Sequence, residues 1–193
     1  EGAYPYLRLL AGANRRTDAL DADVVEAYWI GNELLDRVTP HEFELSIDDR
    51  FRRRAGADWR HLGEALPSGV ANHAFHVMHV MPWAGLMRDG IVDEPLRIID
   101  RCRVSWATVL HPIGPAAGDG LHQVLIRRTP LHWSGSRLVF GTPTVERVTS
   151  PFEVAAGDVV AVHWDWICER LDAGQLAWLR RVTGCQLQRL RAG

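Results

Sequence analysis

The sequence has 193 residues and a net charge of −2, and its 47% hydrophobic and 24% charged residues are typical of a globular protein with its own core. All 22 basic residues are arginine, which excludes Schiff-base chemistry, lysine nucleophiles and the phosphate-binding lysine of a P-loop. The near-neutral charge does not favour nucleic-acid binding, and no apolar run reaches the roughly 18 residues of a membrane span. The three cysteines are an odd number without a C-x-x-C pair, so we expect a reducing, cytoplasmic location.

The first half of the chain is predicted to be helical. Apolar residues recur at helical spacing from Asp23 to Val38, and Thr39-Pro40-His41-Glu42 is typical of a capping box that starts the next helix. One further helix is predicted to start near residue 58 and to end before Pro67. Another is predicted from about residue 72 to residue 81, where Pro82 ends or kinks it. We therefore expect a helical domain over residues 1–94.

From residue 95 the chain changes to short segments rich in Val, Ile and Leu, separated by turns. The expected strands cover residues 96–100, 104–110, 123–128, 137–140, 144–148 and 159–164. Short strands at this spacing favour a small closed barrel, because closure removes exposed edges. A last helix has Leu176, Leu179 and Val182 on one face. The prediction is an α+β protein, with a β-barrel and C-terminal helix over residues 95–193.

Two predicted strands each carry one soft-metal ligand, Cys102 and His163. A thiolate and an imidazole suit iron, zinc or copper, but two residues do not complete a tetrahedral site. Asp165 follows two residues after His163, on the same face of an extended strand, where its carboxylate is expected to orient the imidazole. The structural alternative is that Cys102 is a small buried apolar residue and His163 is hydrogen-bonded inside the barrel.

A second group of candidate ligands, His73, His76 and His79, has the spacing of three that brings neighbours together on a helix. Two adjacent histidines are able to bind one metal ion together, whereas binding of one ion by all three is geometrically awkward. The alternative is a buried helix whose histidines hydrogen-bond within the core. One hypothesis joins both groups: this helix packs over the mouth of the barrel, and one of its histidines becomes a further ligand beside Cys102 and His163.

The order of motifs in the second half resembles the HypC/HupF family of hydrogenase maturation chaperones. In that family a Cys begins an apolar strand, a Gly-Asp-apolar-apolar-x-Val-His segment follows, and a Leu-Asp step leads into a C-terminal helix. The matching positions over about residues 100–185 are Cys102, Gly157, Asp158, Val162, His163, Leu171 and Asp172. The sequence departs from the pattern at Trp106-Ala107, where the family has Pro-Gly, and Cys102 is internal instead of following an initiator methionine.

The resemblance implies an OB-like barrel and a role in handling the iron of a nickel-iron hydrogenase, which carries cyanide and carbonyl. It assigns Cys102 and His163 to the family's iron-binding Cys and His. The implied partner is a hydrogenase large-subunit precursor or another maturation protein. The first hypothesis is therefore an accessory protein that carries metal and has no turnover of its own.

Two other interpretations stay open at the level of sequence. A metalloenzyme would use His73, His76 and His79 with Cys102 as ligand or nucleophile, and it requires a deep pocket and at least three protein ligands. A metal-free protein-interaction module would keep the shape of the barrel and lose the metal chemistry of the family. The two departures from the family pattern, the internal Cys102 and the Trp106-Ala107 step, favour this interpretation.

Overall fold

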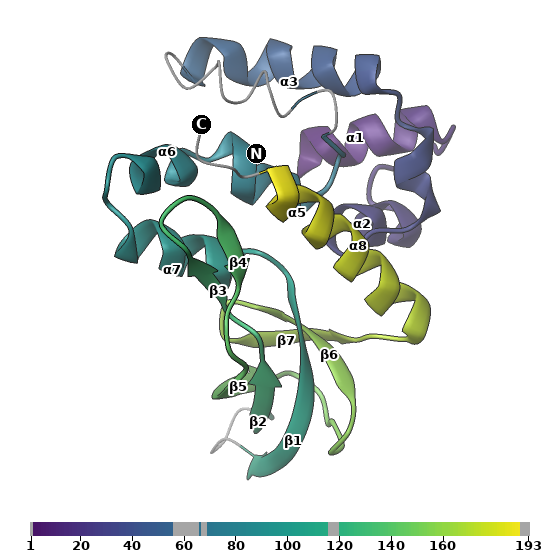
Figure 1. The fold of residues 1–193 in the computed structure, drawn as a ribbon. Helices are drawn as coiled ribbons and strands as arrows, with labels where there is room; N and C mark the ends of the chain where they lie inside the picture. Colours follow the sequence, from purple (N-terminus) through teal and green to yellow (C-terminus); the bar gives the residue numbers. More distant parts are fainter. Residues whose placement is uncertain (1, 56–65, 67–68, 116–119, 190–193) are drawn as a thin grey trace.

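The computed structural model describes residues 2–55, 66, 69–115 and 120–189. In Figure 1 the helices of the first half gather on one side of a β-barrel, and the C-terminal helix α8 leads back from the barrel to them. The helices before the barrel are α1 (Tyr4–Ala13), α2 (Ala22–Trp29), η1 (Glu33–Arg37), α3 (Pro40–Ala55), α5 (His73–Phe75), η4 (His76–Val80), α6 (Trp83–Arg88) and α7 (Asp93–Cys102). The predicted α+β fold class is confirmed. The helix predicted from about residue 58 to before Pro67 lies, except for Leu66, outside the described residues.

The single helix predicted from Asp23 to Val38 is divided in two. Helix α2 ends at Trp29, and the short 3-10 helix η1 follows after Gly31 and Asn32. Gly31 has φ +107°, and a Cβ there would come within 3.1 Å of Val182 in α8, so only glycine fits this turn comfortably. The side chain of Asn32 then accepts a hydrogen bond from the Leu34 amide and caps η1.

The predicted capping box at the start of α3 is confirmed. The Thr39 hydroxyl accepts a hydrogen bond from the Glu42 amide, while the Glu42 carboxylate accepts one from the Thr39 amide at 3.0 Å. Phe43 and Ile47 follow on one face and are buried in the helical core. The capping box therefore identified the start of this helix from the sequence.

The second part is a five-stranded closed barrel in the order β1-β2-β5-β7-β6, with β3 and β4 as a separate two-stranded sheet. The strands are β1 (Ser105–Pro115), β2 (His122–Arg128), β3 (Leu131–Trp133), β4 (Leu138–Phe140), β5 (Thr144–Ser150), β6 (Val159–His163) and β7 (Trp166–Arg170). Parallel pairing of β5 with β7 at Thr149 and Trp166 closes the barrel. Apolar side chains, among them Val109, Val124, Ile126 and Val160, fill its interior. The sequence analysis did not predict β3 and β7.

The strand predicted over residues 96–100 is wrong, because this segment belongs to helix α7. Asp93 and Glu94 lie in its first turn, where acidic groups favour a helix, and Ile99 is fully buried. The β-branched pair Ile98-Ile99 suggested a strand, but the packing of one apolar helical face decides the structure. Cys102 is consequently the last residue of a helix and not part of a strand.

A buried ionic network fastens α7 to the barrel. The Asp100 carboxylate accepts hydrogen bonds from Arg103 at 3.1 Å, from Arg128 at 2.8 Å and from the Leu131 amide at 2.8 Å. Both arginine side chains are almost fully buried, and Arg128 also pairs with Glu146. Burial acts to raise the pKa of Asp100, but the Arg128 hydrogen bond and the two guanidinium charges outweigh it and lower the pKa.

Helix α8 (Ala173–Arg189) packs on both parts of the protein, as its predicted apolar face suggests. Leu179 and Leu176 belong to a hydrophobic cluster with Ala161 of the barrel and Val104 just before β1, while Val182 joins the helical core. The domain boundary predicted at residues 94/95 falls in the first turn of α7. No described helix has the length and apolar character needed to cross a membrane.

Candidate metal centre

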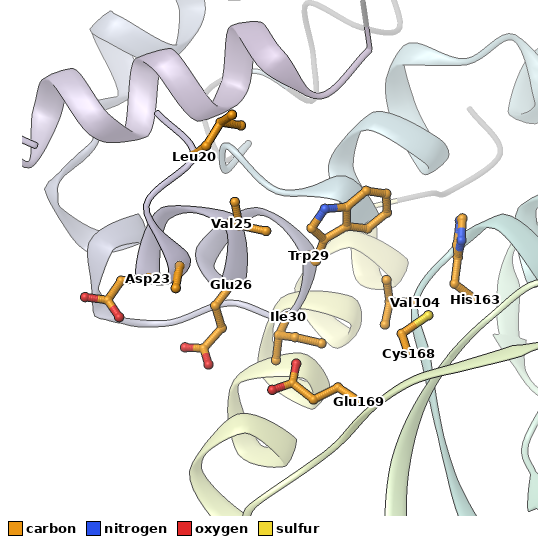
Figure 2. A pocket seen from close by; sticks show the side chains of 11 residues that line it. Leu20, Asp23, Val25, Glu26, Trp29, Ile30, Val104, His163, Cys168 and Glu169 are labelled. Carbon is orange, nitrogen blue, oxygen red and sulfur yellow. The ribbon is translucent and has the colours of Figure 1, made fainter. Parts of the chain in front are cut away.

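A pocket of about 550 Å³ opens between α2 and the strands β6 and β7. At one end lie Trp29, Cys168 and His163, and at the other the carboxylates of Asp23, Glu26 and Glu169, as Figure 2 shows. Neither Cys168 nor Trp29 was identified from the sequence as a site residue. His163, at the inner end, also belongs to a second cluster of side chains.

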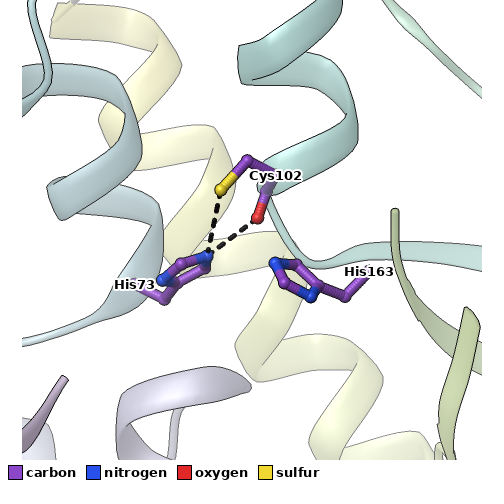
Figure 3. A group of neighbouring side chains, drawn as sticks. All are labelled: His73, Cys102 and His163. Carbon is purple, nitrogen blue, oxygen red and sulfur yellow. Dashed lines mark hydrogen bonds between the residues drawn. The ribbon is translucent and has the colours of Figure 1, made fainter. Parts of the chain in front are cut away.

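The structure brings together His73, Cys102 and His163 from three separate elements, α5, α7 and β6. Each offers one possible ligand atom, and the three atoms lie within 4.8 Å of one another. Figure 3 shows the two imidazoles side by side next to Cys102. The chain therefore has the arrangement of the joint hypothesis, in which one histidine of the His73–His79 segment lies beside Cys102 and His163.

Local backbone structure explains how His73 reaches this position. Asn72 caps the short helix α5 by accepting from the Ala74 amide, and its side-chain amide donates to the Ala27 carbonyl at 3.0 Å. Asn72 therefore ties α5 to α2, and His73, the first residue of α5, is buried against the ring of Trp29 at a centroid distance of 4.4 Å.

Cys102 and His163 are held together by the backbone beside them. The Trp164 amide donates to the Arg101 carbonyl at 2.8 Å, which links the end of β6 to the end of α7. The Arg101 guanidinium also donates to Glu146 at 3.0 Å and to Asp165 at 2.9 Å. These contacts form the Arg101 clamp, one residue away from each of the two candidate ligands.

Asp165 has a different position from the one expected. Strand β6 ends at His163, and Trp164 has a φ of 55°, so the alternation of an extended strand stops before Asp165. Its exposed carboxylate pairs with Arg101. The structure thus assigns Asp165 to the clamp instead of to the His163 imidazole.

His76 and His79 are not members of the close group, which among the described residues contains His73 alone from this helix. His76 hydrogen-bonds through Nδ1 to the Tyr6 hydroxyl at 3.1 Å, and His79 packs against the ring of Phe75. The segment continues from α5 into the π-helical turn η4, so its histidines do not follow regular α-helical spacing.

Hydrogen bonds set the state of the His73 ring. Its Nε2 lies 2.8 Å from the Cys102 carbonyl and its Nδ1 lies 3.2 Å from the Tyr28 hydroxyl. A neutral ring with its proton on Nε2 satisfies both, because Nε2 donates to the carbonyl and Nδ1 accepts from Tyr28. Tyr28 was not identified from the sequence, since its contact with His73 spans 45 residues and leaves no local pattern.

Burial controls the protonation of all three candidate ligands. It lowers the pKa of His73 to about 4. The hydrogen bond to the Cys102 carbonyl acts to raise this pKa, and the nearby His163 and His76 lower it further. Burial also lowers the pKa of His163, against a smaller opposing effect of the Cys102 carbonyl, and raises the pKa of the Cys102 thiol. At neutral pH both imidazoles are therefore neutral, as ligands must be, and the thiol is protonated.

The distances fit a tetrahedral metal site after a small movement. Metal bonds of about 2.3 Å to sulfur and about 2.05 Å to nitrogen place the two ligand atoms about 3.6 Å apart. Cys102 Sγ is 3.9 Å from His73 Nε2. His163 Nε2 is buried and has no hydrogen-bond partner among the described residues, and a bound ion would satisfy it.

The chain belongs to a family of unknown function, DUF6390, whose model matches residues 1–192. The match includes the helical part and the barrel together, so the residues from both parts that form the close group lie within one family unit. No curated protein and no solved structure matches the chain.

Proposed function

We propose that this protein binds one transition-metal ion through His73, Cys102 and His163 and acts as a metal-handling accessory protein. The observation that carries the proposal is the convergence of these three ligand atoms, from three different elements, within 4.8 Å. One thiolate with two imidazoles suits zinc, iron, cobalt or copper. Three protein ligands leave the fourth tetrahedral position open, which allows an exogenous ligand or a client protein to reach the metal.

Metal binding requires two local changes. His73 Nε2 exchanges its hydrogen bond to the Cys102 carbonyl for the metal, and the ring proton moves to Nδ1. The Tyr28 hydroxyl then accepts from Nδ1 instead of donating to it, so the hydrogen bond is kept in both states. Cys102 loses its proton, so one proton is released for each ion bound.

We further propose that the metal is iron, as a cyanide- and carbonyl-bearing fragment, and that the client is a nickel-iron hydrogenase precursor or a maturation partner. This step rests on the resemblance to the HypC/HupF family. It is supported by the proximity of Cys102 and His163, the two residues that match the family's iron ligands, and by the barrel followed by a helix. The free thiol of Cys102 fits a reducing cytoplasm.

The test is anaerobic loading with Fe(II), followed by metal analysis and infrared spectra of the cyanide and carbonyl stretching region after incubation with the maturation system. The variants are His73→Ala, Cys102→Ala and His163→Ala, with Cys185→Ala and His111→Ala as matched controls at exposed positions outside the group. We expect about one iron per chain in the wild type and both controls, with strong loss in the three site variants. Equal metal content in all six proteins would overturn the metal site. Metal binding without the infrared bands would overturn the hydrogenase assignment alone.

A metalloenzyme is the second candidate, favoured by the pocket of about 550 Å³ that shares His163 with the site. Three protein ligands and an open position are also the arrangement of catalytic zinc sites. The rate of metal transfer to a competing chelator distinguishes the carrier from the metalloenzyme. A carrier gives its ion to the chelator within minutes. An enzyme retains its ion, also through repeated dilution.

A further inference from the structure

The pocket beside the metal centre has an apolar wall and an acidic rim. Its wall includes Trp29, Ile30 and Val104, and Figure 2 shows the carboxylates grouped at the end away from His163. Among the described residues that line the pocket none is an arginine, although arginine supplies every basic side chain apart from histidine in this protein. A volume of about 550 Å³ is in the range of sites for small organic molecules.

Two of the carboxylates, Glu26 and Glu169, are held by neutral amide groups. Gln175 donates from its side-chain amide to Glu26 at 2.7 Å and to Glu169 at 3.1 Å, and Asn32 donates to the other oxygen of Glu26 at 3.0 Å. Within the described part of the chain neither glutamate forms an ion pair. The Gln175 amide nitrogen lies between the two carboxylates and brings them together without supplying a positive charge, which favours a cation that contacts both from the pocket.

Asp23, the third carboxylate, differs in this respect. It forms an ion pair with Arg16 at 2.8 Å, so its charge is already compensated. Glu26 is half-buried, which strengthens its interaction with a cation compared with a fully exposed carboxylate. The pocket therefore has a polar end defined by Glu26 and Glu169.

The apolar wall determines the rest of the ligand. Trp29 is half-buried, and its indole contacts His73 and His163 at centroid distances of 4.4 and 5.4 Å. The ring is thus held in place, and an apolar group that lies along it and Ile30 would leave water at little conformational cost.

We propose that this pocket binds a small organic cation, a primary amine that carries an apolar chain or ring. The ammonium group contacts Glu26 and Glu169 from the pocket side of the Gln175 amide, and the apolar body lies along Trp29 and Ile30 towards His163. This inference goes beyond the proposed metal function, because neither carboxylate belongs to the metal group and the amine binds without a metal ion.

The test uses three probes of the same shape and different charge: 4-phenylbutylamine, 4-phenylbutanol and 4-phenylbutyrate. Binding to the full chain, stripped of metal and at low salt, is measured by calorimetry at pH 7. We expect the amine to bind at least about tenfold more tightly than the alcohol, and the carboxylate to bind most weakly, since two ion pairs together supply about this factor. Equal affinities for the three probes, or no binding of the amine at millimolar concentration, would overturn the proposal.

Variants place the ligand in the pocket. The double change Glu26→Gln and Glu169→Gln should weaken the amine about tenfold and leave the alcohol unchanged, while Asp23→Asn should alter neither. Ala22→Trp, at an exposed lining position at the start of α2, should weaken both probes by narrowing the pocket. An unchanged amine affinity in the double variant would refute the site. Because the protein is metal-free throughout, failure of the metal centre would not affect these results.

Discussion

Acidification should destabilise the metal-free protein through protonation of His73. Its side chain is 7% exposed, and burial lowers its pKa from 6.5 to about 4. Between these two values the unfolded chain holds a proton on this ring that the folded chain excludes. The unfolded state therefore binds more protons, so stability is greatest above pH 6.5 and falls as the pH is lowered towards 4.

The size of the effect follows from linkage. Each pH unit between the two pKa values costs about 1.4 kcal/mol, so a change from pH 7 to pH 4.5 removes about 2.5 kcal/mol of unfolding free energy. In His73→Gln the amide is able to donate to the Cys102 carbonyl and does not titrate, so this loss should disappear. The lowered pKa values of His163 and Asp100 also reduce stability at low pH. They do so in the wild type and in His73→Gln alike, so their contribution cancels when the two proteins are compared.

The assay is urea unfolding, followed by circular dichroism at pH 7 and pH 4.5, of the wild type, His73→Gln and His111→Gln. His111 is exposed on β1, so its replacement should leave the pH dependence of the wild type intact. The difference between the two pH values should be about 2.5 kcal/mol smaller in His73→Gln than in the other two proteins. The same pH dependence in all three would refute the reasoning.

Three further predictions concern the buried network and the metal centre. Asp100→Asn should lower the unfolding free energy by about 3–5 kcal/mol in urea titrations, because it leaves two buried arginines without their shared carboxylate; a loss below about 1 kcal/mol would contradict this. Binding of Zn²⁺ should release about one proton, from Cys102, in calorimetry with two buffers of different ionisation enthalpy; no release would exclude a thiolate ligand. Tyr28→Phe should weaken metal binding about tenfold or more in chelator competition, because His73 Nδ1 loses its partner, whereas Tyr6→Phe should not.

Local patterns predicted the parts of the fold that depend on neighbours in the sequence. The box at Thr39 and Glu42 marks a helix start through contacts over three residues, and the apolar face of α8 recurs at helical spacing. The segment 96–100 failed because two adjacent isoleucines fit a strand or a helix equally well over so short a length. Packing of Ile99 against distant residues decides between them, and this information is not local.

The candidate site could be predicted only in part for the same reason. Cys102 and His163 are recognisable from their chemistry and from the motif around them, and one of three histidines was expected to join them. The choice of His73 over His76 and His79 depends on the Asn72 cap and on the π-helical turn that follows. The partners Tyr28 and Trp29 belong to α2, far away in sequence, so no spacing rule reaches them.

The position of the site explains why both parts of the chain are needed for it. His73 comes from the helical part and His163 from the barrel, while Cys102 ends the helix that lies between them. The Arg101 clamp fixes Cys102 and His163 relative to each other, and the Asn72 amide fixes His73 relative to α2. An ion held by all three residues would add a cross-link between α5, α7 and β6, beside the ion pairs that already join α7 to the barrel. Metal binding would therefore stabilise the contact between the helical part and the barrel, and loss of the ion would loosen it.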